Sequence, residues 1–170
     1  MTGDQKVVVT GVVAGVSSMV ALVAGLYHAL PAPAHVSNVA DRLAYALRLD
    51  LFAVLPLFFM LMSVGNARFN SEAINPLVPT DNPKVVVNGR VANNTLEQTF
   101  IFVVAGGVLS TLLAPDQLGL LMACTIAFVL ARLAFWIGYR IHPLYRAAGM
   151  AATSYLNIGL LAGAVYLSLR

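Results

Sequence analysis

Charged side chains are scarce in this sequence. The 170 residues hold 10 lysines and arginines and 7 aspartates and glutamates, so that only 10% of the chain is charged. A soluble globular domain carries charge on about a quarter of its residues, and this scarcity excludes an ordinary soluble fold. The formal net charge is +3 and the basic residues are spread along the chain. Such a distribution argues against a nucleic-acid partner and indicates membrane topology instead.

Cysteine is almost absent as well. Cys124 is the single cysteine and lies in an apolar run, which excludes an intramolecular disulfide and a cysteine-based zinc site. We expect it to be a small buried hydrophobic side chain. The three histidines, His28, His35 and His142, are predicted at different ends of the apolar segments, so no metal site is predicted. No phosphate-binding loop and no hydrolase triad is visible either.

Long apolar runs dominate the chain, which is 59% hydrophobic. A membrane-spanning helix needs roughly 17 to 25 mainly apolar residues. The sequence therefore predicts an all-α integral membrane protein. Five segments reach or nearly reach this length, namely residues 7–30, 51–67, 91–114, 118–139 and 147–169.

The amino-terminal part of the chain can be interpreted in two ways. Residues 1–36 are predicted to hold an extra transmembrane helix, followed by an interfacial helix over residues 37–49. The "PAPA" stretch before residue 35 also offers the Ala-x-Ala pattern of a cleaved signal peptide. The apolar run is longer than the usual h-region of about 7–15 residues, and Asp4 opposes the single Lys6, so we favour a retained helix.

A long polar stretch separates the second and third predicted spans. This stretch, "NARFNSEAINPLVPTDNPK", contains Pro76, Pro79 and Pro83 and is predicted to be a loop. An excess of lysine and arginine marks the cytoplasmic side of a membrane protein. We therefore expect an integral protein of a bacterial inner membrane, with the amino terminus and this loop in the cytoplasm and the carboxyl terminus outside. Six lysines and arginines are predicted on the side of this loop and three on the opposite side, namely Lys6, Arg68, Lys84, Arg90, Arg140 and Arg146 against Arg42, Arg48 and Arg170.

The third span opens with an unusually polar stretch, "NGRVANNTLEQTF". At 100° per residue, Arg90, Asn94 and Glu97 lie on one stripe of a helix, with Glu97 roughly 10 Å deeper than Arg90. An ionised group at such depth costs about 2.5–3.5 kcal/mol on the lenient insertion scale. Such residues persist when they face protein or a wet cavity and have a partner.

The fourth span supplies a candidate partner for Glu97. Arg132 lies roughly 12 Å inward from Arg140, at a depth similar to that of Glu97 on the antiparallel neighbouring helix. We expect Arg132 and Glu97 to pair or to share a ligand. A buried ion pair that only locks two helices together is an equally good interpretation of the same residues.

Further polar side chains are predicted to converge on this cytoplasmic-side region. Tyr139 follows Arg132 by seven residues, Arg146 lies seven further on, and Arg68 ends the second span. Clustered arginines recognise carboxylates or stabilise an anion, and an acid holds an ammonium group. The set predicts a small zwitterionic ligand with more than one carboxylate.

Two motifs at these positions resemble the MAPEG family, the membrane-associated proteins in eicosanoid and glutathione metabolism. They are "RVANNTLE" and "ARLAFWIGYRIHPLYRAAG", and the resemblance covers roughly residues 50–170. It implies a homotrimer of four-helix protomers with glutathione bound between subunits on the cytoplasmic side. Residues 1–36 would then be an addition to the four-helix domain.

The resemblance also implies roles for individual residues. Arg146 matches the arginine that stabilises the glutathione thiolate, and the thiolate would attack a lipophilic electrophile or reduce a lipid hydroperoxide. Phe135 stands where many family enzymes have a tyrosine. The two function classes are a glutathione-dependent transferase or peroxidase, with glutathione as co-substrate, and a non-catalytic membrane scaffold or small carrier. The expected glutathione-binding residues are Arg68, Arg90, Asn94, Glu97, Arg132 and Tyr139. Of these, Glu97 would lie near the glutathione amino group.

Overall fold

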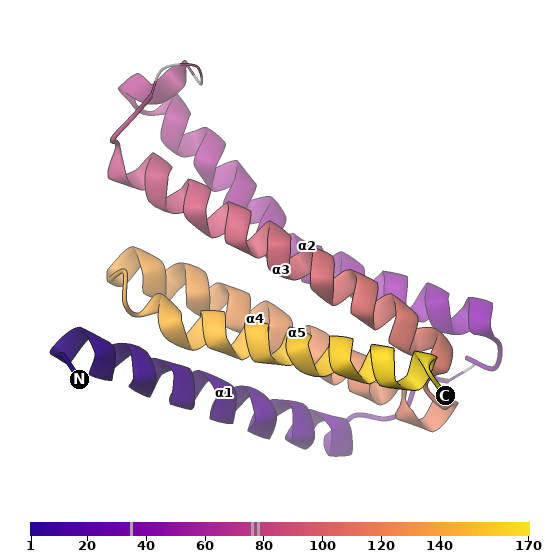
Figure 1. The fold of residues 1–170 in the computed structure, drawn as a ribbon. Helices are drawn as coiled ribbons and strands as arrows, with labels where there is room; N and C mark the ends of the chain where they lie inside the picture. The colour runs from indigo at the N-terminus through magenta and orange to yellow at the C-terminus, as the bar shows by residue number, and fades with distance from the viewer. Residues whose placement is uncertain (35, 76, 78) are drawn as a thin grey trace.

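Five long helices make up most of the protein. The computed structural model describes residues 1–34, 36–75, 77 and 79–170, and no strand occurs in these ranges. The helices lie side by side, and each reverses the direction of the one before it (Figure 1). They are α1 (Gly3–Ala29), α2 (Val39–Phe69), α3 (Pro83–Leu112), α4 (Gly119–Ile141) and α5 (Arg146–Ser168), with the short 3-10 helices η1 (Glu72–Ile74) and η2 (Pro115–Gln117).

All five of these helices are long and apolar enough to cross a membrane, within the described ranges. The shortest has 23 residues, which gives about 35 Å at 1.5 Å per residue, more than the hydrocarbon core of about 30 Å. The prediction of an all-helical integral membrane protein with five spans is therefore confirmed.

Helix α2 corrects one predicted boundary. The interfacial helix expected over residues 37–49 and the second span join into one continuous helix of 31 residues. Asn38 caps its start, where its side chain accepts a 2.8 Å hydrogen bond from the backbone N–H of Asp41. No glycine or proline interrupts the chain until Pro56, so nothing ends the helix near residue 50.

Helix α3 begins eight residues before the predicted position. Pro83 occupies its first turn, and the Asn82 side chain accepts hydrogen bonds from the backbone N–H groups of Lys84 and Val85. Proline suits the first turn of a helix because its missing N–H would be unpaired there anyway. The predicted loop is therefore shorter at both ends and contains η1. Two residues discussed above, His35 and Pro76, lie outside the described residues.

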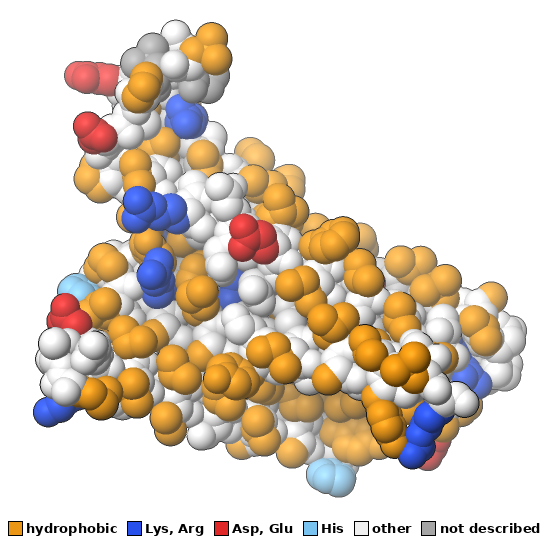
Figure 2. All heavy atoms as spheres, in the orientation of Figure 1, with side chains coloured by type: hydrophobic (Ala, Val, Ile, Leu, Met, Phe, Trp, Pro, Cys, Tyr) orange, Lys and Arg blue, Asp and Glu red, His pale blue; other side chains and the backbone are white. Residues whose placement is uncertain are grey.

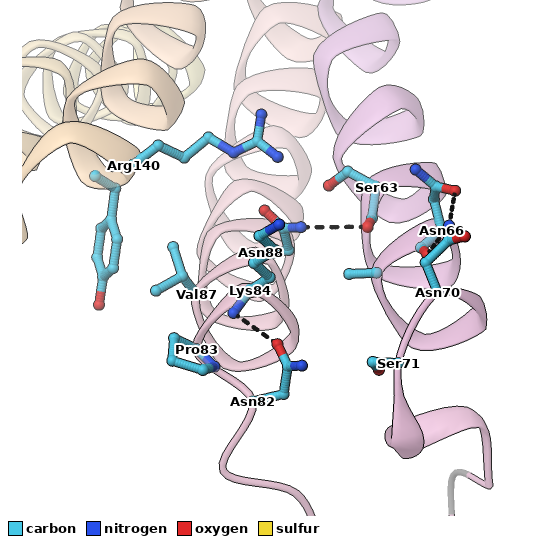
Figure 3. Close-up of a pocket in the computed structure, with 12 residues that line it drawn as sticks. Ser63, Asn66, Asn70, Ser71, Asn82, Pro83, Lys84, Val87, Asn88 and Arg140 are labelled. Atoms are coloured by element: carbon cyan, nitrogen blue, oxygen red, sulfur yellow. Dashed lines mark hydrogen bonds between the residues drawn. The ribbon is translucent and has the colours of Figure 1, made fainter.

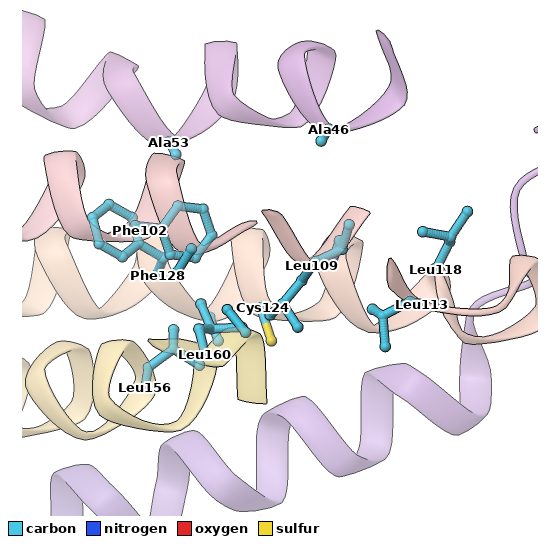
Figure 4. Close-up of a cluster of buried hydrophobic side chains, with 14 of the residues drawn as sticks. Ala46, Ala53, Phe102, Leu109, Leu113, Leu118, Cys124, Phe128, Leu156 and Leu160 are labelled. Atoms are coloured by element: carbon cyan, nitrogen blue, oxygen red, sulfur yellow. The ribbon is translucent and has the colours of Figure 1, made fainter. Parts of the chain in front are cut away.

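The main apolar core joins α2, α3, α4 and α5 (Figure 4). At its centre the rings of Phe102 and Phe128 lie 4.4 Å apart. Cys124 lies in the same core and is 2% exposed, which confirms the prediction that it is a buried hydrophobic side chain. This core holds the α2–α3 hairpin against the α4–α5 pair.

Helix α1 packs on the outer side of α4 and α5 (Figure 1). None of its residues is buried, and two of its glycines lie close to α5. A Cβ atom at Gly15 would lie 2.1 Å from the carbonyl oxygen of Ala148, and one at Gly11 would lie 3.2 Å from the Cβ of Ala147. Glycine therefore permits α1 to approach the first turn of α5, directly after Arg146.

Candidate functional site

A fully buried arginine lies at the centre of the polar residues between α3, α4 and α5. Arg132 on α4 is 0% exposed. Its Nη1 donates a 2.9 Å hydrogen bond to Oδ1 of Asn94 on α3. Its Nη2 donates to the carbonyl oxygen of Gly149, at 3.2 Å, and to Oγ1 of Thr153, both on α5. One cation thus ties together three helices.

The charge of Arg132 has no acidic partner within the described residues. Its hydrogen-bond acceptors are an amide, a backbone carbonyl and a hydroxyl, and its Nε atom is buried without any partner. The predicted direct pair with Glu97 does not form. Asn94, one turn before Glu97, takes that place, while the Glu97 side chain is exposed. A ligand shared between Arg132 and Glu97 stays a prediction.

Two aromatic rings between two arginines continue the cluster from Arg132 along α4. The guanidinium carbon of Arg132 lies 4.6 Å from the centroid of the Phe135 ring, which meets the ring of Tyr139 edge-on at 6.0 Å. Arg146 at the start of α5 lies over the ring of Tyr139, with its guanidinium carbon 4.9 Å from the centroid. Its Nη1 also donates a 3.2 Å hydrogen bond to the Tyr139 hydroxyl. The rings of Phe135 and Tyr139 therefore lie between two cations.

The remaining predicted site residues do not join this cluster within the single chain. Arg90 and Glu97 on α3 are exposed. Arg68 is half-buried and donates a 3.2 Å hydrogen bond from Nη1 to the carbonyl oxygen of Ala73. The chain therefore brings together Asn94 with Arg132 and Tyr139 with Arg146, and leaves the other three apart.

Charged groups lie at both ends of the molecule. Figure 2 shows lysine, arginine and acidic side chains over the end that carries the α2–α3 connection and at the opposite end, while hydrophobic side chains cover most of the visible face between them. The amino terminus and the α4–α5 connection lie at the end of the α2–α3 connection (Figure 1). Hydrophobic cover along the helices with charge at their ends is the expected surface of a membrane protein.

Sequence reasoning missed two contacts of Arg132 and one buried acid. Thr153 lies seven residues after Arg146 and so on the same face of α5, a spacing that indicates its orientation. Nothing in the sequence singles out the carbonyl of Gly149. Asp50 on α2 is 8% exposed and its Oδ2 atom has no hydrogen-bond partner.

These features define an integral membrane helical bundle with a cationic, aromatic-lined site near one end of α4 and α5. The MAPEG family profile matches residues 50–166, most of the chain. The protein therefore belongs to the MAPEG family, and the resemblance noted in the sequence is confirmed. The match covers α2 from residue 50 onward, α3, α4 and all but the last two residues of α5, and α1 precedes it.

Two curated relatives share the name Transmembrane protein 79. The mouse (Mus musculus) protein is 26% identical over 159 residues, which cover 93% of this chain and 40% of the relative. The bovine (Bos taurus) protein is 26% identical over 133 residues, which cover 78% of this chain and 33% of the relative. The chain thus spans well under half the length of either protein. No solved structure matches it.

Proposed function

We propose that the protein binds glutathione on the side of the membrane where α5 begins and activates its thiol for reaction with lipophilic molecules. The observation that carries this proposal is the buried charge of Arg132, which no acid within the described residues neutralises. Membership of the MAPEG family supports the same conclusion.

A buried cation without a counter-ion favours an anionic ligand. Taking a charge out of water costs several kcal/mol, and neutral hydrogen-bond acceptors offset only part of this cost. Arg132 makes three hydrogen bonds, whereas a guanidinium has five N–H donors. A carboxylate of glutathione next to Asn94 would bring the missing negative charge close to Arg132.

In this proposal Arg146 would act on the sulfur atom. It is exposed and is the first residue of α5, so its guanidinium and the positive end of the helix dipole act at the same point. A cation next to a thiol lowers the thiol pKa and increases the thiolate fraction. Tyr139 holds this guanidinium in place through the hydrogen bond and the ring contact described above.

Self-association would complete the site, and a homotrimer is part of the proposal. Glu97 lies in the middle of α3 yet is exposed, and a charge facing lipid at that depth costs about 2.5–3.5 kcal/mol. Leu96 and Phe100 beside it are 55% and 69% exposed. A second copy that covers this face of α3 would enclose Glu97 together with Arg90. Glu97 would then hold the ammonium group of glutathione, and Arg90 one of its carboxylates.

The reaction uses the thiolate as a nucleophile. Attack on an electrophilic carbon forms a thioether bond and expels the leaving group with its electron pair. With a lipid hydroperoxide, two glutathione thiols supply two electrons, so that the products are a lipid alcohol, water and glutathione disulfide. The lipophilic partner would arrive from the bilayer.

Replacement of Arg146 tests the proposal, with Arg170→Ala as the control for loss of one exposed terminal cation. The wild type and the control should generate the ultraviolet absorbance of the glutathione thiolate and conjugate chlorodinitrobenzene. Loss of the cation should raise the pKa of the glutathione thiol by about one unit, which corresponds to about 1.4 kcal/mol. Arg146→Ala should therefore lower both the thiolate absorbance and the conjugation rate by about tenfold. Cross-linking should show the same oligomer in all three proteins. Equal thiolate signals in Arg146→Ala and the wild type would contradict the assignment.

A second candidate is a non-catalytic member that uses the same scaffold for binding or assembly. Phe135 supports it, because a phenyl ring supplies no hydroxyl to a ligand, and the printed name of the two relatives states no activity. Wild-type protein that binds glutathione without forming thiolate would favour this candidate. Absence of glutathione binding would refute the transferase or peroxidase and leave the non-catalytic scaffold or carrier.

A further inference from the structure

A large polar pocket lies outside the cluster around Arg132. It has a volume of about 830 Å³ and is enclosed by α2, the start of α3 and the end of α4 (Figure 3). Of the predicted glutathione-binding residues only Tyr139 lines it. Asparagines supply much of its polar lining, namely Asn66 and Asn70 from α2, the α3 cap Asn82, and Asn88 from α3.

The asparagines are held in place by bonds that leave other polar atoms available. Asn88 is 3% exposed and its Nδ2 donates a 3.2 Å hydrogen bond to the carbonyl oxygen of Ser63. The Oδ1 of Asn66 accepts a 2.8 Å hydrogen bond from Nδ2 of Asn70, and the Oδ1 of Asn82 caps α3. Within the described residues, the Nδ2 groups of Asn66 and Asn82 donate no hydrogen bond to protein and remain free for a ligand.

The charge of the pocket is positive. Lys84 from α3 and Arg140 from α4 line it, and no acid is among the described lining residues. The Arg140 side chain extends from α4 toward Asn88 (Figure 3), and its guanidinium lies 5.1 Å from the ring centroid of Trp136. The α3 helix begins at Pro83, and although Asn82 caps the N–H groups of Lys84 and Val85, the positive end of the helix dipole lies at the same wall.

These features favour one ligand chemistry. Two cations, free amide donors and a helix start suit a phosphate group, which has several acceptor oxygens. The volume lies within the range of small-molecule sites, about 300–1,000 Å³, and exceeds the space that a single phosphate fills. The pocket therefore has room for a phosphate ester with a polar body that meets Asn70 and Asn88.

We propose that this pocket binds a phosphate ester, either the headgroup of an anionic phospholipid or a soluble phosphorylated molecule. The pocket differs from the glutathione site in most of its lining, because Arg132, Asn94 and Glu97 do not line it, and Tyr139 is common to the two. It lies at the ends of α2 and α4, where helices that cross a bilayer reach the headgroup region. The ligand would bridge α2–α3 to α4 at the end of the molecule where the helices separate (Figure 1).

The test uses the full chain in detergent with two probes. Native mass spectrometry measures retention of dioleoyl phosphatidylglycerol against dioleoyl phosphatidylcholine, and calorimetry measures binding of glycerol 3-phosphate. The variant Lys84→Ala/Arg140→Ala is compared with the matched control Arg48→Ala/Arg170→Ala, which removes two exposed cations elsewhere. The pocket variant should lose about tenfold or more in affinity for the bound probe, as expected for the loss of charge-assisted contacts, and the control should retain it.

The outcomes separate the two sources of phosphate. Retention of phosphatidylglycerol alone identifies a lipid headgroup, and binding of glycerol 3-phosphate that displaces the lipid identifies a soluble ester. No preference for either probe over phosphatidylcholine in the wild type overturns the proposal, as does an equal loss in the control. Asn66→Asp is a second variant that keeps the test valid if the double variant misfolds. It adds a negative charge to the pocket and retains the acceptor for Asn70. It should also abolish binding, with unchanged circular dichroism and unchanged glutathione binding.

Discussion

Thr153→Val is the substitution that most directly tests the role of the buried arginine. Valine has nearly the shape of threonine but no hydroxyl, so the change removes an acceptor from Arg132 without opening a cavity. Thr153 is 0% exposed, and its hydroxyl also donates within α5, to the carbonyl oxygen of Gly149 at 2.9 Å. The substitution therefore acts on polar contacts inside the bundle and leaves the surface unchanged.

The expected loss of stability follows from the contacts of Arg132. A hydrogen bond to a charged group contributes about 1.5–3 kcal/mol. The Nη2 atom keeps the carbonyl oxygen of Gly149 at 3.2 Å as a second acceptor, which places the effect at the lower end. We expect the free energy of unfolding to fall by about 1.5 kcal/mol, roughly a tenfold change in the unfolding equilibrium.

Thr125→Val provides the matched control. Thr125 is also buried, and its hydroxyl donates only to the carbonyl oxygen of Leu121 in its own helix, so its loss should cost about 0.5 kcal/mol or less. Unfolding by sodium dodecyl sulfate can be followed by fluorescence, because Trp136 is the single tryptophan. Thr153→Ser should stay closer to the wild type than Thr153→Val. Identical unfolding midpoints for the two valine variants would refute the argument.

Three further predictions follow from packing. Gly15→Leu should weaken α1 packing by about 1–3 kcal/mol, because even a Cβ would lie 2.1 Å from the Ala148 carbonyl oxygen. The control Gly25→Leu enters open space. Thermal unfolding should give a lower midpoint for Gly15→Leu than for Gly25→Leu, and equal midpoints would contradict the contact. Cys124, 2% exposed, should react with a maleimide only in denaturant, and rapid labelling of native protein would place it elsewhere. Phe102→Ala removes a ring that is 3% exposed and should destabilise the bundle by about 3 kcal/mol, measured by the same dodecyl sulfate titration; a loss below about 1 kcal/mol would show that the core collapses around the gap.

The fold could be predicted because the bilayer imposes one requirement on each span. Backbone groups inside lipid must be paired within the segment, so a long apolar run has to be a helix. The helix ends were harder to predict, since polar residues can extend a helix beyond the bilayer. The start of α3 at Pro83 depends on a proline and an asparagine cap, and the continuity of α2 through residue 50 depends on the lack of any interruption.

The site was predicted in composition and depth but not in its contacts. Arg132 does reach α3 at the expected level, yet it bonds Asn94, one turn from the predicted Glu97. A depth estimate from counting residues carries an error of about one turn, 5.4 Å, and the rotation of each helix depends on packing with its neighbours. Trimer assembly, glutathione as ligand, the cytoplasmic orientation and the bacterial inner membrane stay predictions. The two relatives are mammalian.

The contact between α1 and α5 has a consequence for how the protein responds to its membrane. A lipid tail is as apolar as the side chains of α1, so transfer out of water provides no force that holds this helix in place. Its 27 residues extend about 40 Å, longer than a hydrocarbon core of about 30 Å, so α1 must tilt or thicken the surrounding lipid. A change in bilayer thickness would therefore act against the packing of Gly11 and Gly15 on the start of α5. Lipids with shorter chains should weaken the packing of α1 against the first turn of α5, which carries Arg146.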